Sequence, residues 1–218
     1  AFLTEDMHNY IVILDGHIVA QNLSEEYKDI TIEDASKLSE EFVKYYESDS
    51  VNSLTSESIE FNKQNTNSGL FIRAKRNKTY LETLHVFYVQ VNNEFIHNSM
   101  IVLEENSQLK YFEYLINSTD SNINFVSNTF VLENATIDYS GISRYGSNAE
   151  VAVTRNAFIK RYGNAHYSIA EINDSNISSL TNIMLQEEYA SGTSKTVAIT
   201  SDKQIAKFIQ LVEHKAKE

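Results

Sequence analysis

Apolar and polar residues recur in one order through the second half of the chain. Four segments each open with Asn, place a large apolar residue two positions later and then reach charged residues. They begin at Asn98, Asn128, Asn156 and Asn182, at intervals of 30, 28 and 26 residues. A loose period of this size is typical of a stacked repeat.

Each repeat contains a second apolar segment, which follows a short polar turn. These second segments lie at residues 109–115, 137–142, 166–170 and 195–199. Their alternation and their β-branched and aromatic residues predict strands. Two strands in so short a repeat leave no space for crossover helices, so the pattern favours a mainly β protein built as a parallel β-helix. A β-sandwich also has many short strands, but the similarity between successive repeats favours the β-helix.

The start of the chain predicts a β-hairpin. Apolar segments at 10–14 and 17–20 flank Asp15-Gly16. This dipeptide between two apolar strands is the strongest short-range signal for a tight hairpin turn.

A short helix and a connector are expected next. Apolar residues at helical spacing predict an amphipathic helix over 33–46, with Thr31 as its cap. The polar stretch that follows, with its scattered apolar residues, predicts a connector. We therefore expect an N-terminal segment over 1–66, made of the hairpin, helix and connector, and a β-helix core over 67–218.

Composition and charge exclude several classes of partner. The net charge is −12, and a field of this sign repels phosphates, so no nucleic-acid partner is expected. The apolar runs are far shorter than the roughly 20 residues of a membrane helix, so no membrane partner is expected either. The first ten residues are acidic where a signal peptide would be basic and apolar, which predicts a cytoplasmic protein.

The residue types offer little chemistry. The chain has no cysteine, which excludes thiolate metal sites and cysteine nucleophiles within it. Its six histidines lack the short spacings of metal ligands, and no nucleotide-binding or hydrolase motif occurs. We expect no catalytic, cofactor-binding or metal-binding residue and no enzymatic activity.

The asparagines that open the repeats have a structural interpretation. Asn tolerates turn conformations, and a column of Asn can form a ladder of side-chain amide hydrogen bonds along a stack. We therefore expect Asn98, Asn128, Asn156 and Asn182 to lie at equivalent corners of the β-helix.

Three segments carry a resemblance to a known family. Residues 101–111 read Ile-Val-Leu-Glu-Glu-Asn-Ser-Gln-Leu-Lys-Tyr, residues 130–139 read Phe-Val-Leu-Glu-Asn-Ala-Thr-Ile-Asp-Tyr, and residues 145–153 read Tyr-Gly-Ser-Asn-Ala-Glu-Val-Ala-Val. Together they resemble the SufB/SufD family of SUF iron–sulfur cluster assembly proteins, and SufD more than SufB. The likeness covers about residues 10–218 and rests on the repeat, not on a catalytic signature.

The resemblance implies a fold, a role and partners. The fold would be a right-handed parallel β-helix, and the role a non-catalytic scaffold that works with SufB-like and SufC-like subunits. The chain would need no cofactor, since the complex would handle the iron–sulfur cluster. The family pattern continues past Glu218, so a truncated β-helix is expected to self-associate through its unpaired end. The alternative function is that of an exported carbohydrate-active or adhesive β-helix protein.

Overall fold

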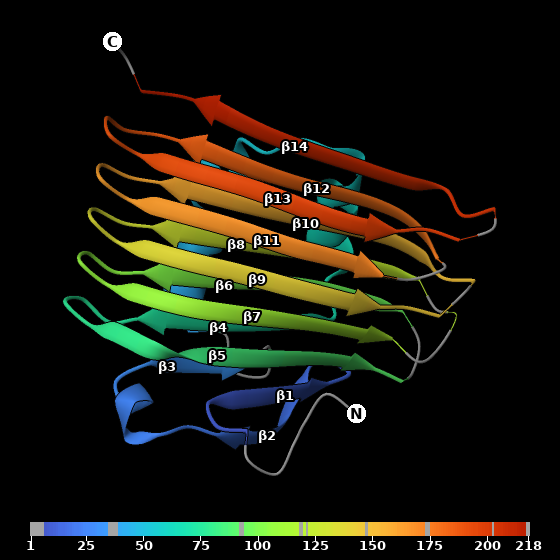
Figure 1. The fold of residues 1–218 in the computed structure, drawn as a ribbon, viewed down its shortest axis with the longest axis horizontal. Helices are drawn as coiled ribbons and strands as arrows, with labels where there is room; N and C mark the ends of the chain where they lie inside the picture. The colour runs from blue at the N-terminus through green and yellow to red at the C-terminus, as the bar shows by residue number, and fades with distance from the viewer. Residues whose placement is uncertain are drawn as a thin grey trace.

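The strands of the protein form two sheets that face each other (Figure 1). The computed structural model describes residues 7–34, 39–91, 94–117, 120, 122–146, 148–172, 175–201 and 203–216. Sheet A has the strand order β13-β11-β9-β7-β5-β1-β2, and sheet B has the order β14-β12-β10-β8-β6-β4-β3.

The chain alternates between the two sheets from β4 to β14. Sheet A consists of β1 (Tyr10–Leu14), β2 (His17–Asn22), β5 (Thr79–Gln90), β7 (Gln108–Asn117), β9 (Thr136–Arg144), β11 (Asn164–Ile172) and β13 (Ser191–Ile199). Sheet B consists of β3 (Thr31–Asp34), β4 (Ser68–Ala74), β6 (Phe95–Leu103), β8 (Ile123–Val131), β10 (Glu150–Ile159), β12 (Asn176–Leu185) and β14 (Ala206–His214). Strands of successive turns pair in parallel. This arrangement confirms the mainly β, parallel β-helix fold that the repeat predicts.

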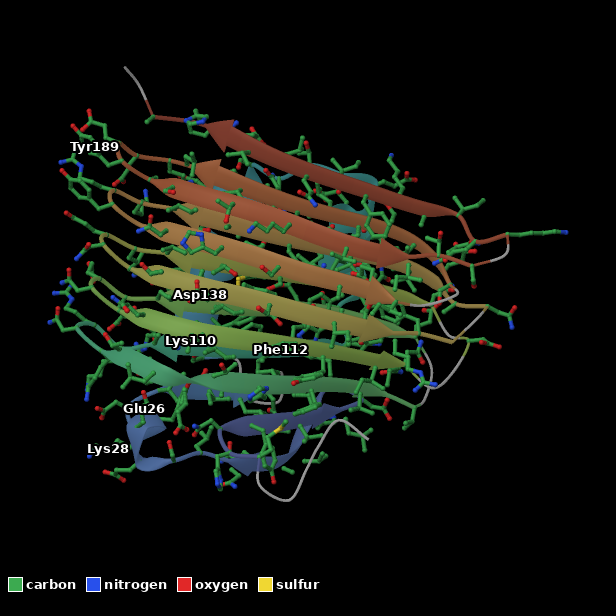
Figure 2. All side chains as sticks on the ribbon, viewed as in Figure 1. Glu26, Lys28, Lys110, Phe112, Asp138 and Tyr189 are labelled. Atoms are coloured by element: carbon green, nitrogen blue, oxygen red, sulfur yellow. The ribbon has the colours of Figure 1, made fainter. Side chains whose placement is uncertain are left out.

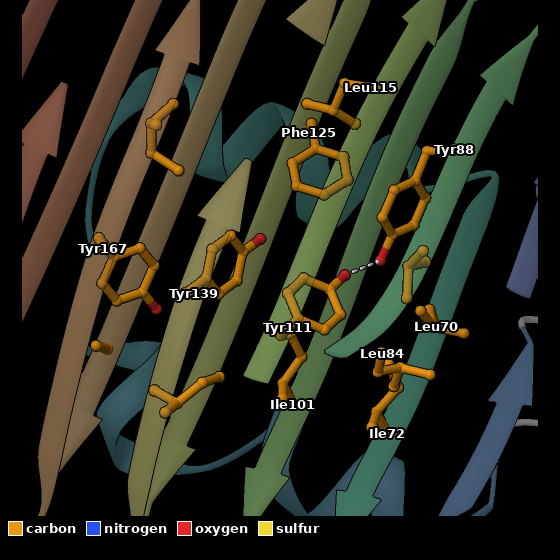
Figure 3. Close-up of a cluster of buried hydrophobic side chains, with 14 of the residues drawn as sticks. Leu70, Ile72, Leu84, Tyr88, Ile101, Tyr111, Leu115, Phe125, Tyr139 and Tyr167 are labelled. Atoms are coloured by element: carbon orange, nitrogen blue, oxygen red, sulfur yellow. Dashed lines mark hydrogen bonds between the residues drawn. The ribbon is translucent and has the colours of Figure 1, made fainter. Parts of the chain in front are cut away.

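Side chains alternate between the space enclosed by the two sheets and the outer faces. The enclosed space holds the main hydrophobic core. In-register pairing stacks like residues on like, so Tyr139 lies 4.8 Å from Tyr111 and 4.6 Å from Tyr167 between ring centroids (Figure 3). Such stacked aromatic pairs stabilise the interior beyond their buried area.

The N-terminal hairpin is confirmed and belongs to the same core. β1 and β2 pair antiparallel around Asp15 and Gly16, whose φ angles of 46° and 90° are those of a tight hairpin turn. β1 also pairs in parallel with β5, and β3 pairs antiparallel with β4. Ile11 and Ile13 are fully buried in the main core. The N-terminal strands therefore extend both sheets and share the core of the β-helix.

The first helix begins later than its apolar pattern predicts. α1 spans Glu40–Tyr46, and the Ser39 hydroxyl caps it by accepting a hydrogen bond from the Phe42 amide. Thr31 lies in β3 and caps no helix, so that prediction is wrong. The early part of the expected helix pairs with β4 instead, because the edge of sheet B offers it backbone partners. Residues 35–38 of the predicted helix lie outside the described residues.

The expected connector contains two helices, which its polar composition did not predict. α2 (Asp49–Asn52) and α3 (Glu57–Asn65) each follow a serine whose hydroxyl accepts a hydrogen bond from the third backbone amide beyond it. These cap residues, Ser48 and Ser56, are part of the polar composition of the stretch. Each helix is short, and a few apolar side chains are enough to pack it against sheet B. None of the helices in the described ranges is long and apolar enough to cross a membrane.

Helices cover the outer face of sheet B. Phe42, Val51, Leu54 and Ile59 from the helical segment form a second hydrophobic cluster with outward-facing residues of this sheet. Those sheet residues are Phe71, Met100, Val102, Phe130, Phe158 and Met184. Figure 1 shows these helices behind the strands, whereas sheet A faces the viewer with no described helix over it.

A left-handed residue marks the corner after each strand of sheet B from β4 to β12. These residues are Asn77, Asn106, Asn134, Tyr162 and Tyr189, with φ between 55° and 62°. The amide of Asn106 donates to Asn77 Oδ1, and the amide of Asn134 donates to Asn106 Oδ1, both at 2.8 Å. Tyr162 and Tyr189 continue the column as rings stacked 4.9 Å apart. Asn suits this position because it tolerates the left-handed conformation.

The structure corrects the position expected for the repeat asparagines. Asn98, Asn128, Asn156 and Asn182 lie within β6, β8, β10 and β12, and not at corners. The apolar residues that follow each of them continue a strand that has already begun, so the repeat boundary read from the sequence falls inside the strand. The corner ladder instead uses Asn77, Asn106 and Asn134.

Replacing Asn106 with alanine is expected to lower the free energy of unfolding by about 1 kcal/mol, because alanine adopts the left-handed conformation less readily than asparagine. Urea unfolding measures the change. Asn106→Gly is the matched control, because it removes the same side-chain hydrogen bonds and keeps the conformation accessible. Equal destabilisation by both variants would show that the backbone conformation is not the cause.

Candidate functional site

A buried amide ladder joins the helices to sheet B. Asn128 donates to Asn98 Oδ1 at 3.3 Å, and Asn156 donates to Asn128 Oδ1 at 3.0 Å. Asn98 donates in turn to Oδ1 of Asn62 in α3 at 2.9 Å. Asn182 lies in register with Asn156 in β12, at the far end of the column. The repeat asparagines therefore have an architectural role on the outer face of sheet B.

Asn62 is the residue that fixes α3 on the sheet. Its side chain is fully buried, and its amide donates to the His97 carbonyl and to Asn124 Oδ1, both at 2.9 Å. Buried amides are costly unless hydrogen-bonded, so this bonding selects one position for the helix.

A groove of about 500 Å³ lies beside α3 on the outer face of sheet B. Its lining includes Phe61 of α3 and, from sheet B, Ile96, Val151, Ala152 and Ile177. Its rim carries Glu94, Glu150 and Lys207, and Asn176 donates to Glu150 at 2.8 Å. An apolar groove with a few polar groups suits binding. The described residues of its lining include no histidine and no cysteine.

An interior charge cluster, made of Arg155, Glu113 and Glu171, lies between the two sheets. The register turns all three side chains inward from β10, β7 and β11, and their side chains are at most 1% exposed. Arg155 Nη2 lies 2.6 Å from Glu113 Oε1 and 3.7 Å from Glu171 Oε1. Tyr139 donates a hydrogen bond to Glu113, and Ser143 donates one to Glu171.

The charges in this cluster stabilise one another. Burial alone would lower the pKa of Arg155, but Glu113 and Glu171 outweigh it and raise the pKa. Burial raises the pKa of Tyr139 well above its ordinary value, and Glu113 adds to the effect. Tyr139 therefore stays a neutral donor while Arg155 stays charged.

A chain of hydrogen bonds occupies the other end of the interior. His97 lies between Ser68, 2.6 Å from its Nδ1, and Ser99, 2.7 Å from its Nε2. Ser99 contacts the Tyr88 hydroxyl at 3.0 Å, and Tyr88 contacts Tyr111 at 2.9 Å (Figure 3). Burial lowers the pKa of His97 to about 3, so the imidazole is neutral near pH 7.

These interior groups are buried and closed to solvent. The sequence analysis did not identify them. Glu113, Arg155 and Glu171 each occupy a position in a strand where the alternating pattern otherwise places an apolar residue, and that was the available signal. Within the described ranges, no three His, Cys, Asp or Glu side chains gather to hold a metal ion. The interior charges and hydrogen bonds can stabilise one register of the strands.

Comparison with known families decides the family. The family described as "SUF system FeS cluster assembly, SufBD core domain" matches residues 86–218, more than half of the chain. The chain belongs to the SufBD family. A comparison with curated proteins finds no match. The matched part of this SufBD chain begins in β5 and contains the interior charge cluster, so these features lie within the SufBD core. The family has its role in SUF iron–sulfur cluster assembly, alongside other components of that system.

Replacing Arg155 with leucine is expected to lower the free energy of unfolding by about 3–5 kcal/mol, because two buried carboxylates lose their cation. Urea unfolding measures the loss. The triple variant Arg155→Leu, Glu113→Leu and Glu171→Leu is expected to recover most of it, since an apolar replacement of a whole buried cluster is often neutral or stabilising. A single variant as stable as the original protein would contradict the assigned ion pairs.

Acid is expected to destabilise the protein through His97. The unfolded chain binds a proton below about pH 6.5, whereas the folded His97 stays neutral down to about pH 3. This contribution to stability is therefore complete above pH 6.5 and falls by about 1.4 kcal/mol per pH unit below it. His97→Gln removes that part of the acid sensitivity, as measured by urea unfolding at pH 4.5 and 6.5.

The exposed His17 supplies the control for this experiment. His17→Gln is expected to leave the difference between the two pH values unchanged. An unchanged difference in His97→Gln would show that His97 is not the group responsible.

Proposed function

We propose that this SufBD chain is a SufD-like, non-catalytic scaffold subunit that works with SufB-like and SufC-like subunits in the cytoplasm. The absence of cysteine from all 218 residues carries the proposal. This stretch has no thiolate with which to hold sulfur or a cluster, so the complex handles the cluster and this chain supports the complex.

The distribution of polar groups supports a scaffold. The strongest charge interactions, between Arg155 and its two glutamates, lie in the sealed interior. The accessible features are a groove with an apolar lining and a broad sheet face, which suit binding. Membership of the SufBD family also disfavours the exported carbohydrate-active or adhesive alternative.

Co-purification tests the scaffold role. The full-length protein, expressed with the SufB-like and SufC-like proteins of the same organism, is expected to elute with them as one complex. Purified alone, it is expected to show no ATP hydrolysis and to bind no iron–sulfur cluster after anaerobic reconstitution, as measured by absorbance and iron content.

Three results would contradict the proposal. They are a stable cluster on the isolated protein, no association with either partner, and cleavage of polysaccharides by the isolated protein. Cell fractionation tests the cytoplasmic location, and recovery with exported proteins would contradict it.

A further inference from the structure

An apolar stripe crosses the outer face of sheet A. The register aligns one outward residue from each of six neighbouring strands, β1 to β13. In order these residues are Val12, Phe87, Tyr114, Ile142, Ala170 and Val197. Ile172 and Ile199 pair with each other beside the stripe.

The stripe is most exposed over its last strands. Val197 is 63% exposed, and Ile172 and Ile199 are 45% and 58% exposed. At the other end the rings of Phe87 and Tyr114 stack at 4.2 Å, and both side chains are buried, at 3% and 8% exposed. The exposed part of the stripe therefore lies over β11 and β13, and exposed apolar residues gathered in this way mark an interaction site.

The charge beside the stripe is opposite to that of the whole protein. The outward positions of β7, β9, β11 and β13 carry three cations, Lys110, Arg144 and Lys195, against one acid, Asp138. None of these three cations forms an ion pair with a described residue. Figure 2 shows Lys110 and Asp138 on this face, with Phe112. A locally positive face on a chain of net charge −12 complements an acidic partner.

The protein shows on sheet B how such a face is covered. There α1 lies on the outer face, with Tyr45 at 4.8 Å from Phe130 between ring centroids. At its edge Glu41 accepts a hydrogen bond from Arg73 at 2.6 Å. An acidic amphipathic helix therefore fits an apolar surface with a flanking cation on this same scaffold.

We propose that the outer face of sheet A binds an amphipathic helix of a partner protein, apolar on one side and acidic along its flanks. The helix lies across the strands, along the stripe. Five strand spacings of about 4.8 Å give roughly 24 Å, the length of a helix of about 16 residues. In this binding mode, apolar side chains at helical spacing anchor the partner helix to the surface. It goes beyond the scaffold role and does not depend on resemblance to SufD.

Binding of designed helical peptides to the full-length protein tests the inference. The probe is a stapled 16-residue helix with leucines on one face and glutamates on the flanks, and fluorescence anisotropy reports its binding. The matched peptide carries lysine in place of every glutamate. The acidic peptide is expected to bind more tightly, and to weaken as salt is raised.

Variants locate the site. Ile172→Glu with Val197→Glu is expected to abolish binding, and Arg144→Glu with Lys195→Glu to weaken it about tenfold. Leu211→Glu is the control, because Leu211 is 43% exposed on β14 of sheet B, and it is expected to bind normally. Circular dichroism and the melting temperature confirm that each variant is folded.

Three outcomes would overturn the inference. One is equal binding of the acidic and basic peptides, and another is equal loss of binding in Leu211→Glu. The third is self-association of the protein that the stripe variants abolish, without any peptide binding, which would identify a second copy as the occupant. None of these results bears on co-purification with SufB-like and SufC-like proteins, so the scaffold proposal is tested separately.

Discussion

In-register parallel pairing of successive turns is the constraint on which the rest of the structure depends. It places Tyr139 between Tyr111 and Tyr167 in the interior and Asn106 between Asn77 and Asn134 at the corner. A shift of one residue would exchange the inner and outer faces of a strand. The ladders of aromatic rings and amides therefore form together or not at all.

The interior charges restrict which turn can stack on which. Similar repeats could pair after a slip of a whole turn, but such a slip would take Arg155 away from Glu113 and leave a buried charge unpaired. Specifying a register is the best-attested use of buried polar groups. This chemistry is sealed inside, and helices cover the outer face of sheet B.

The sequence predicted the architecture better than its details. Apolar alternation identified two strands per repeat, and Asp15-Gly16 identified the hairpin, because both depend on local patterns.

The helices at 49–52 and 57–65 were missed because tertiary contact with sheet B, and not apolar periodicity, stabilises them. The repeat asparagines lie within strands and not at the expected corners. Amide ladders form equally at corners and on a strand face, and composition does not distinguish the two. The interior charge cluster depends on residues up to 58 positions apart, from Glu113 to Glu171, which only the register brings together.

Disulfide trapping tests the register most directly, because the 218 residues contain no cysteine to interfere. Ser140 and Ser168 are register partners on the outer face of sheet A, and Ala170 lies two residues further along β11. Under mild oxidation, Ser140→Cys with Ser168→Cys is expected to form a disulfide rapidly, whereas Ser140→Cys with Ala170→Cys is not. Faster crosslinking of the Ser140 and Ala170 pair would contradict the register and the account built on it.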